Sequence, residues 1–382
     1  MKTHNRFLRA ANTPFMRKFY LFTGLLFLCV QTSFAQFRTY SNEFLNIGAG
    51  ARGLAMGGAQ IASVADGTSA YWNPAGLNGI KDDPQINLMH AEYFAGIGKY
   101  DYGTVAIPLN NNKRVLGLSL LRFAVDDIPN TVFLVEADGT INFSNIQTFS
   151  SADYAFLISL AQQVDMKNGK NFNAGINAKI IHRKAGDFAT AWGFGFDAGV
   201  QFTGKKFRLG IAARDVTTTF NAWSFNLNEK MREVFYVTNN EIPVKSTELT
   251  APKLLLGTAY KMKLSENVSL LAELDADLTF DGRRNTIIAS DVVSLDPKIG
   301  LEVSWKEVFF IRAGINNFQK ALDDNDINNI ERVWIYQPGV GAGFKVGDVK
   351  IDYAFTNLAN QSNPLYTHVF SFNLDLKKKM KK

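Results

Sequence analysis

Apolar and polar residues alternate with a period of two in many segments of the chain. Between residues 192 and 202 every second position is apolar, namely Trp192, Phe194, Phe196, Ala198, Val200 and Phe202. The positions between them hold glycine, aspartate and glutamine. The same alternation runs through 172–180, 207–214, 268–278 and 349–356. Because successive side chains of a strand point to opposite faces, these segments are predicted to be strands with one apolar and one polar face.

The two faces of these predicted strands favour a membrane over water. Each segment is about ten residues long, which suits a tilted strand that crosses the hydrocarbon layer. A soluble β-sandwich also alternates, but it buries its apolar face in a core. Here the apolar faces are rich in aromatic residues while the opposite faces carry glycine and charge, as in a barrel with lipid outside and a polar lumen. We therefore predict an all-β fold, a transmembrane antiparallel β-barrel in the cell outer membrane.

The connections between the predicted strands alternate in length. Short turns are expected at 110–113, 166–170, 204–206, 264–267, 305–307 and 347–348. Longer polar connections are expected at 124–150, 183–190, 215–251, 280–296, 317–336 and 357–366. This alternation, which only the first hairpin near 95–98 breaks, is typical of periplasmic turns and extracellular loops. The count is about 14 strands, with the barrel at 84–376 and a basic periplasmic tail at 377–382.

The N-terminus is predicted to be a cleaved export signal. It covers residues 1–35, with Met16 as an alternative start. Arg17 and Lys18 precede an apolar run that is too short to span a bilayer as a helix. Small residues at 33 and 35 then supply a cleavage site.

Cleavage of this signal changes the composition of the mature chain. It removes Cys29, the only cysteine, so disulfides and thiolate metal sites are excluded. It also removes five of the 41 basic residues and leaves 36 against 35 acidic ones; the five are Lys2, Arg6, Arg9, Arg17 and Lys18. A nearly neutral body without a basic stripe excludes nucleic acid as a partner.

Residues 36–83 do not alternate and are rich in small residues. A barrel of about 14 strands has a lumen too wide for its own side chains to fill. This segment is therefore predicted to be a plug, or hatch, inside the lumen. Gly48, Gly50 and Gly53 match the G-x-G-x-x-G pattern of dinucleotide sites, but no strand–helix unit surrounds them. These glycines are expected to allow tight packing, and no cofactor is predicted.

The predicted luminal face carries both signs of charge. Its cations are Lys179, Arg208, Arg214, Lys298, Arg312 and Lys350. Its carboxylates are Asp197, Glu273, Asp275, Asp277, Glu302 and Asp352. A selective ion pore would favour one sign, so we expect salt bridges that anchor the hatch to the wall. Arg52 of the hatch is the hypothesised partner of the acidic face at 273–277.

Two stretches of the hatch resemble a known family. Residues 51–59 read Ala-Arg-Gly-Leu-Ala-Met-Gly-Gly-Ala, and residues 70–77 read Ala-Tyr-Trp-Asn-Pro-Ala-Gly-Leu. Together they resemble the N-terminal signature of the PorV/PorQ family, which is related to FadL-type outer-membrane transporters. The resemblance implies the same barrel with a luminal hatch, and a role in type IX protein secretion. The hatch motif consists of Arg52, Gly53, Met56, Gly57, Gly58, Trp72, Asn73, Pro74, Ala75 and Gly76.

Catalytic residues are not predicted. The histidines after the signal are His90, His182 and His368. A catalytic histidine needs a serine or carboxylate partner at the outer rim. His182, with Asp187 nearby, comes nearest to this, but a strand-end histidine is more simply a rim residue. Histidine and carboxylates nowhere show the spacing of a metal site, so the protein is predicted to be non-enzymatic.

Two functions remain open. In the first, the protein is a component of type IX secretion whose outer loops 124–150 and 215–251 bind a translocon protein or exported cargo. In the second, it is a FadL-like transporter of hydrophobic small molecules, and the same loops line the groove where the solute enters. In both, outer-membrane lipid surrounds the barrel, and the loops make contact through aromatic residues. These are Phe133, Phe143, Phe149, Trp223, Phe225, Phe235 and Tyr236.

Overall fold

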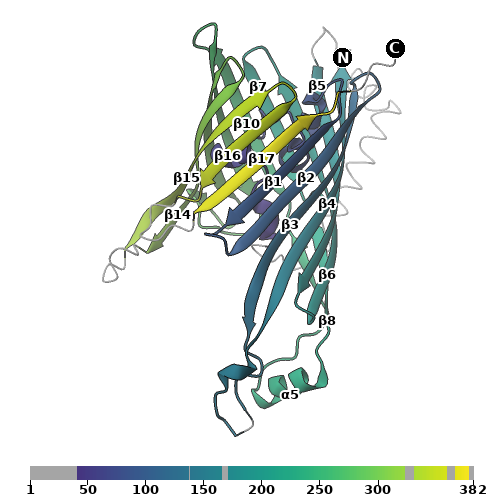
Figure 1. The fold of residues 1–382 in the computed structure, drawn as a ribbon, viewed down its shortest axis with the longest axis vertical. Helices are drawn as coiled ribbons and strands as arrows, with labels where there is room; N and C mark the ends of the chain where they lie inside the picture. Colours follow the sequence, from purple (N-terminus) through teal and green to yellow (C-terminus); the bar gives the residue numbers. More distant parts are fainter. Residues whose placement is uncertain (1–40, 137, 166–170, 323–330, 359–365, 378–382) are drawn as a thin grey trace, which may run out of the picture. The chain divides into compact units, whose positions relative to one another are not determined.

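The computed structural model describes residues 41–136, 138–165, 171–322, 331–358 and 366–377 (Figure 1). The predicted export signal and most of the basic tail lie outside these residues. Four short helices come first in the chain: η1 (Glu43–Asn46), α3 (Ala51–Ala55), α4 (Ser69–Trp72) and η2 (Pro74–Gly79). They belong to the segment predicted to be the hatch.

Fourteen strands form the wall of a closed antiparallel barrel, which confirms the predicted fold. They are β1 (Gln85–Tyr93), β2 (Gly98–Leu109), β3 (Arg114–Asn130), β4 (Gln147–Asp165), β5 (Asn171–Ala185), β6 (Ala189–Thr203), β7 (Phe207–Arg214), β10 (Lys253–Lys263), β11 (Val268–Thr279), β13 (Ser294–Trp305), β14 (Phe309–Leu322), β15 (Arg332–Val346), β16 (Val349–Thr356) and β17 (Thr367–Asp375). β1 pairs with β2 on one side and with β17 on the other, so the sheet closes on itself. Closure removes the free edges that an open sheet would expose to lipid.

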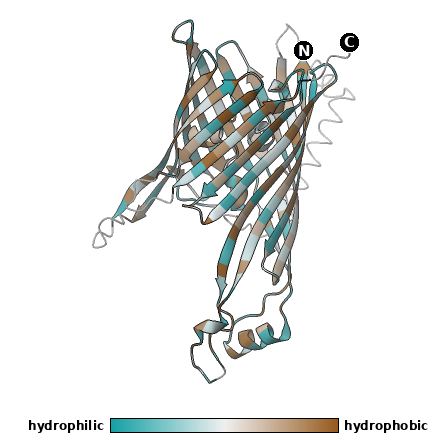
Figure 2. Ribbon diagram, in the orientation of Figure 1, coloured by the Kyte–Doolittle hydropathy of each residue, from teal (hydrophilic) through white to brown (hydrophobic). Residues whose placement is uncertain are grey.

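The two faces of the wall are separated as the alternation predicts. On β4 and β5 the outward side chains of Ile158 and Ile176 are 50% and 56% exposed, whereas their inward neighbours Ser159 and Asn177 are buried. Figure 2 shows the resulting mixture of apolar and polar positions along each strand. An outward apolar face suits lipid, and an inward polar face suits the lumen. In the described part of the chain, no helix is long and apolar enough to cross a membrane.

Several predicted loops are shorter than expected because the strands continue past the membrane-length segment. The connection predicted at 183–190 is wrong: β5 reaches Ala185 and β6 begins at Ala189, so only 186–188 turn. Likewise β3 and β4 pair as far as Asn130 and Gln147, which leaves 131–146 of the predicted loop 124–150. Apolar and polar residues alternate less strictly in these extensions, and for this reason the sequence pattern does not mark them.

The predicted loop 215–251 holds regular structure of its own. It contains β8 (Thr219–Phe225), α5 (Glu229–Val237) and β9 (Ser246–Thr250). β8 pairs with β6 beyond the point where β7 ends, and β9 pairs with β8. Two smaller elements lie in other connections, η3 (Phe143–Asn145) and β12 (Ile288–Ala289). The wall therefore extends outward on the side of β3 to β6, as Figure 1 shows.

A break in pairing separates β7 from β8. Residues 215–218 leave the strand, and Asp215 and Thr218 have positive φ angles of 55° and 58°. The side chain of Lys179 of β5 lies next to this break. Its Nζ is 2.8 Å from Asp197 Oδ1 and 2.5 Å from Asp215 Oδ1. The Lys179 side chain is 5% exposed. This buried triad ties together the strands on both sides of the break.

Candidate functional site

The helical segment at 41–80 lies inside the barrel and is the hatch. α3 packs against β14 to β17, and η2 packs against β3 to β6 on the opposite wall. The hatch therefore spans the lumen from one side to the other. Its core combines hatch residues such as Phe44 and Trp72 with inward residues of the wall such as Tyr100 and Ile181.

Glycines on the inner wall let the hatch backbone approach the strands. A Cβ atom on Gly314 of β14 would collide with the backbone at Met56, and one on Gly210 of β7 would collide with Ile61. Gly175 of β5 faces the Pro74 backbone in the same way, and Gly257, Gly300 and Gly339 also lie close to hatch backbone. Gly199 and Gly341 instead make room for the side chains of Asn73 and Ala55. The strand face that carries glycine and charge in the sequence is thus largely a docking surface for the hatch.

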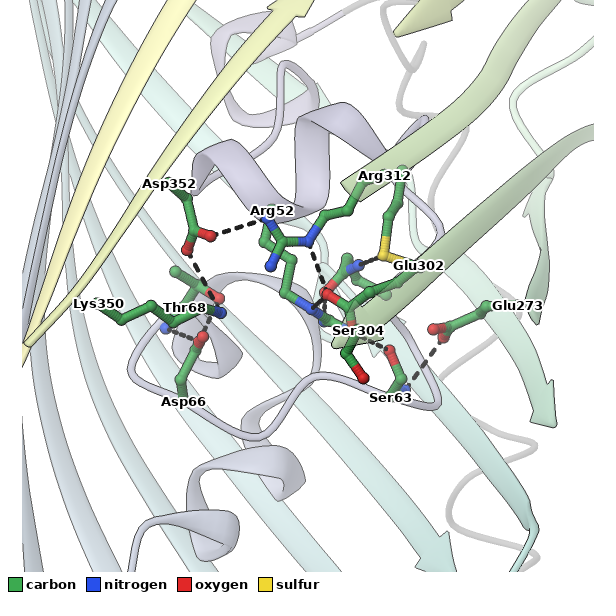
Figure 3. A network of polar contacts seen from close by, with 12 residues as sticks. Arg52, Ser63, Asp66, Thr68, Glu273, Glu302, Ser304, Arg312, Lys350 and Asp352 are labelled. Carbon is green, nitrogen blue, oxygen red and sulfur yellow. Dashed lines mark hydrogen bonds and ion pairs between the residues drawn. The ribbon is translucent and has the colours of Figure 1, made fainter. Parts of the chain in front are cut away.

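The N-terminal half of the hatch motif is held by a buried ionic network (Figure 3). Arg52 Nε lies 2.9 Å from Glu302 Oε2, and the same oxygen lies 2.6 Å from Arg312 Nε. Arg312 Nη1 continues the chain to Asp352 Oδ1 at 2.8 Å. Burial by itself lowers the pKa of Arg52, but the Glu302 carboxylate outweighs burial and raises it. The network joins the hatch to β13, β14 and β16.

Arg52 forms its ion pair with Glu302 and not, as hypothesised, with the acidic face at 273–277, although the charge of Glu273 also raises the pKa of Arg52. Glu273 accepts hydrogen bonds from the backbone N–H groups of Ala62 and Ser63, at 2.8 and 3.1 Å. Asp275 accepts those of residues 60 and 61, at 2.7 and 2.9 Å. These carboxylates satisfy hatch backbone that has no strand or helix partner.

The remaining motif residues pack inside the hatch or cap its helix η2. Trp72 donates its indole N–H to Ala49 O at 2.7 Å and lies against Gly48, Gly53 and Gly58. Asn73 caps η2 through Ala75 N and donates to Ile61 O at 2.9 Å. Met56, Pro74, Ala75 and Gly76 are buried, and Gly57 has a positive φ of 62° next to the backbone of Ile315. The three glycines of the G-x-G-x-x-G match thus serve hatch packing.

The seven aromatic residues predicted in outer loops fall into two groups. Phe143 in η3 and Tyr236 in α5 are 72% and 82% exposed, while Phe133 and Phe235 beside them are half-buried. The other three belong to strands. Phe149 of β4 packs on Phe188, with ring centroids 4.8 Å apart. Trp223 and Phe225 of β8 are half-buried, and Trp223 lies under the Arg183 guanidinium, so they are not the exposed anchors that the sequence predicts.

A cavity of about 640 Å³ lies on the outer side of the hatch. Leu54, Gly58 and Trp72 of the hatch contribute to its floor. One wall is aromatic and consists of Phe44, Tyr93, Phe94 and Phe123. The other lining is rich in amides and ions, among them Asn46, Lys253, Asp277, Arg284, Asp296, Lys298, Asn316 and Gln337. Asn73, Pro74 and Ala75 do not line it.

Among the described residues, no three His, Cys, Asp or Glu side chains could hold a metal ion. His182 stacks between Tyr154 and Trp192, with ring centroids 6.3 and 4.3 Å away. This arrangement fits the simpler prediction of a rim residue.

Comparison with known proteins shows which solved structures have a similar fold. No model of a known family and no curated sequence matches the chain. Among solved structures, the CymD monoaromatic hydrocarbon channel is similar with a TM-score of 0.51 at 11% identity, over 87% of this chain and 98% of that one. The Ralstonia pickettii toluene transporter TbuX gives 0.50 at 12% identity, over 86% and 98%. The chain has the fold of a FadL-like outer-membrane β-barrel.

The P. putida toluene transporter TodX is similar to this FadL-like barrel to the same degree, with a TM-score of 0.50 at 13% identity over 87% and 99% of the two chains. Together with the apolar outer face, the fold confirms the predicted location in the cell outer membrane. What these relatives transport is a property of those proteins, because identities this low speak for the fold alone. Membership of the PorV/PorQ family stays a prediction.

Proposed function

We propose that this FadL-like barrel takes up small, partly hydrophobic molecules from outside the cell. The observation that carries the proposal is the cavity of about 640 Å³ above the hatch, whose aromatic wall offers an apolar surface inside a polar lumen. A volume of this size suits a small-molecule ligand. The similar structures named as a monoaromatic hydrocarbon channel and a toluene transporter support the proposal.

Passage through the barrel requires the hatch to move. The hatch contacts both sides of the wall, and its motif residues are buried, so the hatch separates the outer cavity from the other end of the lumen. A solute held in the cavity would continue only when part of the hatch leaves its glycine contacts. Uptake should therefore stop when the hatch is fixed to the wall.

A disulfide between hatch and wall tests this mechanism. A Cβ on Gly300 would lie 2.9 Å from the Met56 Cβ, so a small shift brings Met56→Cys and Gly300→Cys into bonding range. Uptake of a labelled aromatic hydrocarbon is measured in a Gram-negative host whose outer membrane limits its own uptake. We expect the oxidised double variant to lose uptake and the reduced one to regain it. Equal uptake in both states would contradict the proposal. Met56→Cys alone and Gly300→Cys alone are the controls, the second because a Cβ at 300 would also lie 2.7 Å from Met56 O.

A second candidate function rests on the outer lobe, defined as residues 131–136, 138–146 and 226–245. The lobe lies beyond the outer ends of β3, β4 and β8 and exposes Phe143 and Tyr236 (Figure 1). Its first segment is internally ordered, because Asn142 and Asn145 donate to the Glu136 carboxylate at 2.9 Å each. These bonds lower the pKa of Glu136. A preformed surface with exposed aromatic rings suits a protein partner.

This surface supports the non-enzymatic role in type IX secretion that the PorV/PorQ resemblance implies, with a translocon protein or exported cargo as the partner. The test replaces residues 227–245 with a short Gly-Ser linker and measures secretion and partner pull-down. We expect both to fall, and we expect Phe143→Ala with Tyr236→Ala to reproduce part of the loss. Ser144→Ala, an exposed change in the same lobe, is the control. Unchanged secretion and pull-down in the linker variant would exclude this candidate.

A further inference from the structure

Another cavity lies on the inner side of the hatch, at the end of the barrel where the short turns are. Its volume is about 230 Å³, and both Arg52 of the hatch and its ion-pair partner Glu302 line it. Their side chains are 14% and 13% exposed. Figure 3 shows both residues together with Lys350 of the same lining. The ionic contact that holds the hatch to β13 is therefore accessible from the inner mouth of the barrel.

Positive charge exceeds negative charge around this cavity. Its cations are Arg52, Arg208, Lys261, Lys345 and Lys350, and its carboxylates are Glu302 and Glu307. Lys261 pairs with Glu307 at 3.1 Å. Arg208 and Lys345 form no ion pair within the described part of the chain. With the adjoining Arg312, Asp352 and Glu273 included, six cations surround the cavity against four carboxylates.

Exposed lysines extend this positive charge along the inner rim. Three successive turns connect β6 to β7, β10 to β11 and β13 to β14. The exposed lysines in or beside these turns are Lys205, Lys206, Lys263 and Lys306, and the carboxylates there are Glu266 and Glu307. Backbone bonds join the turns to their neighbours, at 2.8 Å from Lys261 N to Lys206 O and at 2.6 Å from Lys306 N to Asn267 O. The cavity and these four lysines together are named the inner basic surface.

The size and position of the cavity favour a protein segment as its ligand. A volume of about 230 Å³ is below the roughly 300–1,000 Å³ of small-molecule sites, but it accommodates an acidic side chain. The strands β10, β11, β13 and β14 separate the cavity from lipid. A lipid head group could therefore meet the rim lysines but not Arg52. An extended acidic segment reaches both, and clusters of arginine and lysine recognise such segments.

We propose that the inner basic surface docks an acidic segment of a periplasmic protein, and that one of its carboxylates competes with Glu302 for Arg52. Glu302 keeps Arg312 as a partner, 2.6 Å away, when Arg52 turns to the new carboxylate. The exchange therefore leaves no buried charge unpaired, which keeps its cost low. Docking from the periplasm thus loosens the hatch on the side of β13. This role goes beyond uptake, because it assigns a protein partner to the inner end of the barrel.

The test uses a short fluorescent peptide of alternating aspartate and serine, and its counterpart with asparagine in place of aspartate. Binding to the full-length mature protein in nanodiscs of uncharged lipid is measured by fluorescence anisotropy. We expect the acidic peptide to bind at least about tenfold more tightly, as one charge-assisted bond supplies, and we expect salt to weaken it. Lys261→Gln with Lys345→Gln should lower its affinity about tenfold. Lys184→Gln with Lys230→Gln, two exposed lysines at the outer end, is the matched control.

Equal affinity for the two peptides would overturn the docking, and so would an equal loss of affinity in the two double variants. Loss of binding when phosphatidylglycerol is added to the nanodiscs would assign the lysines to membrane lipid and also overturn it. Folding of each variant is checked by its heat-modifiable migration in gels.

Hydrogen exchange of the hatch amides at 50–56 tests the competition for Arg52. The acidic peptide should make this exchange faster in the wild type, and the asparagine peptide should leave it unchanged. Docking of the acidic peptide without faster exchange would overturn the loosening of the hatch. Because solute uptake is not part of either measurement, the outcome is independent of the proposed transport function.

Discussion

Single residues of the wall decide whether the hatch fits. The glycines at 210 and 314 point into the lumen, where any side chain would occupy the space of the hatch backbone. Glycine usually weakens a strand because it has no side chain to pack. Here that loss is offset by close contact between two backbones. The sequence displays these glycines on the polar face, but it cannot say which of them meet the hatch.

Gly314→Val should therefore displace the hatch while leaving the strands intact. The new side chain would overlap Met56, and overpacking of this kind costs about 1–3 kcal/mol or more. Hydrogen exchange should show faster exchange of the amides at 53–62 with unchanged protection of β14. Gly103→Ala is the control, because its Cβ would meet only Leu88 at 3.5 Å. Equal hatch protection in both variants would count against the docking role of Gly314.

Arg52→Met should loosen the hatch through its ionic network. The change removes one of the two arginines paired with Glu302. Because Arg312 remains, the cost should stay below the roughly 3–5 kcal/mol of leaving a buried charge without any partner. Limited proteolysis should cut the hatch faster in the variant. Lys113→Met removes a pair with Asp165 whose side chains are 56% and 57% exposed, and exposed pairs contribute about 0–1 kcal/mol. Similar cleavage rates in the two variants would refute the role of Arg52.

At the scale of elements, the period of two predicts strands well and their pairing poorly. The wall strands were recognisable because one face meets lipid along most of their length. β8 and β9 were missed because Thr219 and Thr250 pair across a long polar connection. The sequence also cannot predict the ion-pair partner of Arg52, because the choice between Glu273 and Glu302 depends on how neighbouring strands are staggered.

The break between β7 and β8 should depend on Lys179. In Lys179→Met, Asp197 and Asp215 would face each other in a buried site without their cation, at a cost of about 3–5 kcal/mol. Denaturation in guanidinium should show the loss, and adding Asp197→Asn should recover part of it. Lys184→Met on the same strand, 50% exposed, should change stability by less than about 1 kcal/mol. No recovery in the double variant would argue against the triad as the stabilising unit.

At the scale of the whole molecule, the protein is a wide barrel filled by its own N-terminal segment. Composition and loop lengths predict the barrel and its location, and the lumen size predicts that something fills it. The outer cavity could not be predicted, because its lining comes from the hatch and from strands throughout the chain. That Arg214 and Lys253 are cross-strand neighbours likewise appears only when β7 and β10 are paired.

The filled lumen predicts a low ion conductance. In planar bilayers the wild-type protein should conduct far less than an open barrel of this strand number, because the hatch reaches both walls. Arg52→Met and Gly314→Val should raise the conductance or make it fluctuate, since each weakens hatch docking. A large steady conductance in the wild type would show that the lumen is open.

The glycine contacts also bear on the order of assembly. The hatch ends just before β1, and β1 must pair with β17, the last strand of the chain. Because the hatch contacts wall backbone at β5, β6, β7 and β14, it could not be inserted after the barrel has closed. The wall is therefore expected to form around the hatch, with the seam between first and last strands closing at the end. The segment that blocks the lumen in the mature protein would then act, during biogenesis, as a template around which the barrel strands assemble.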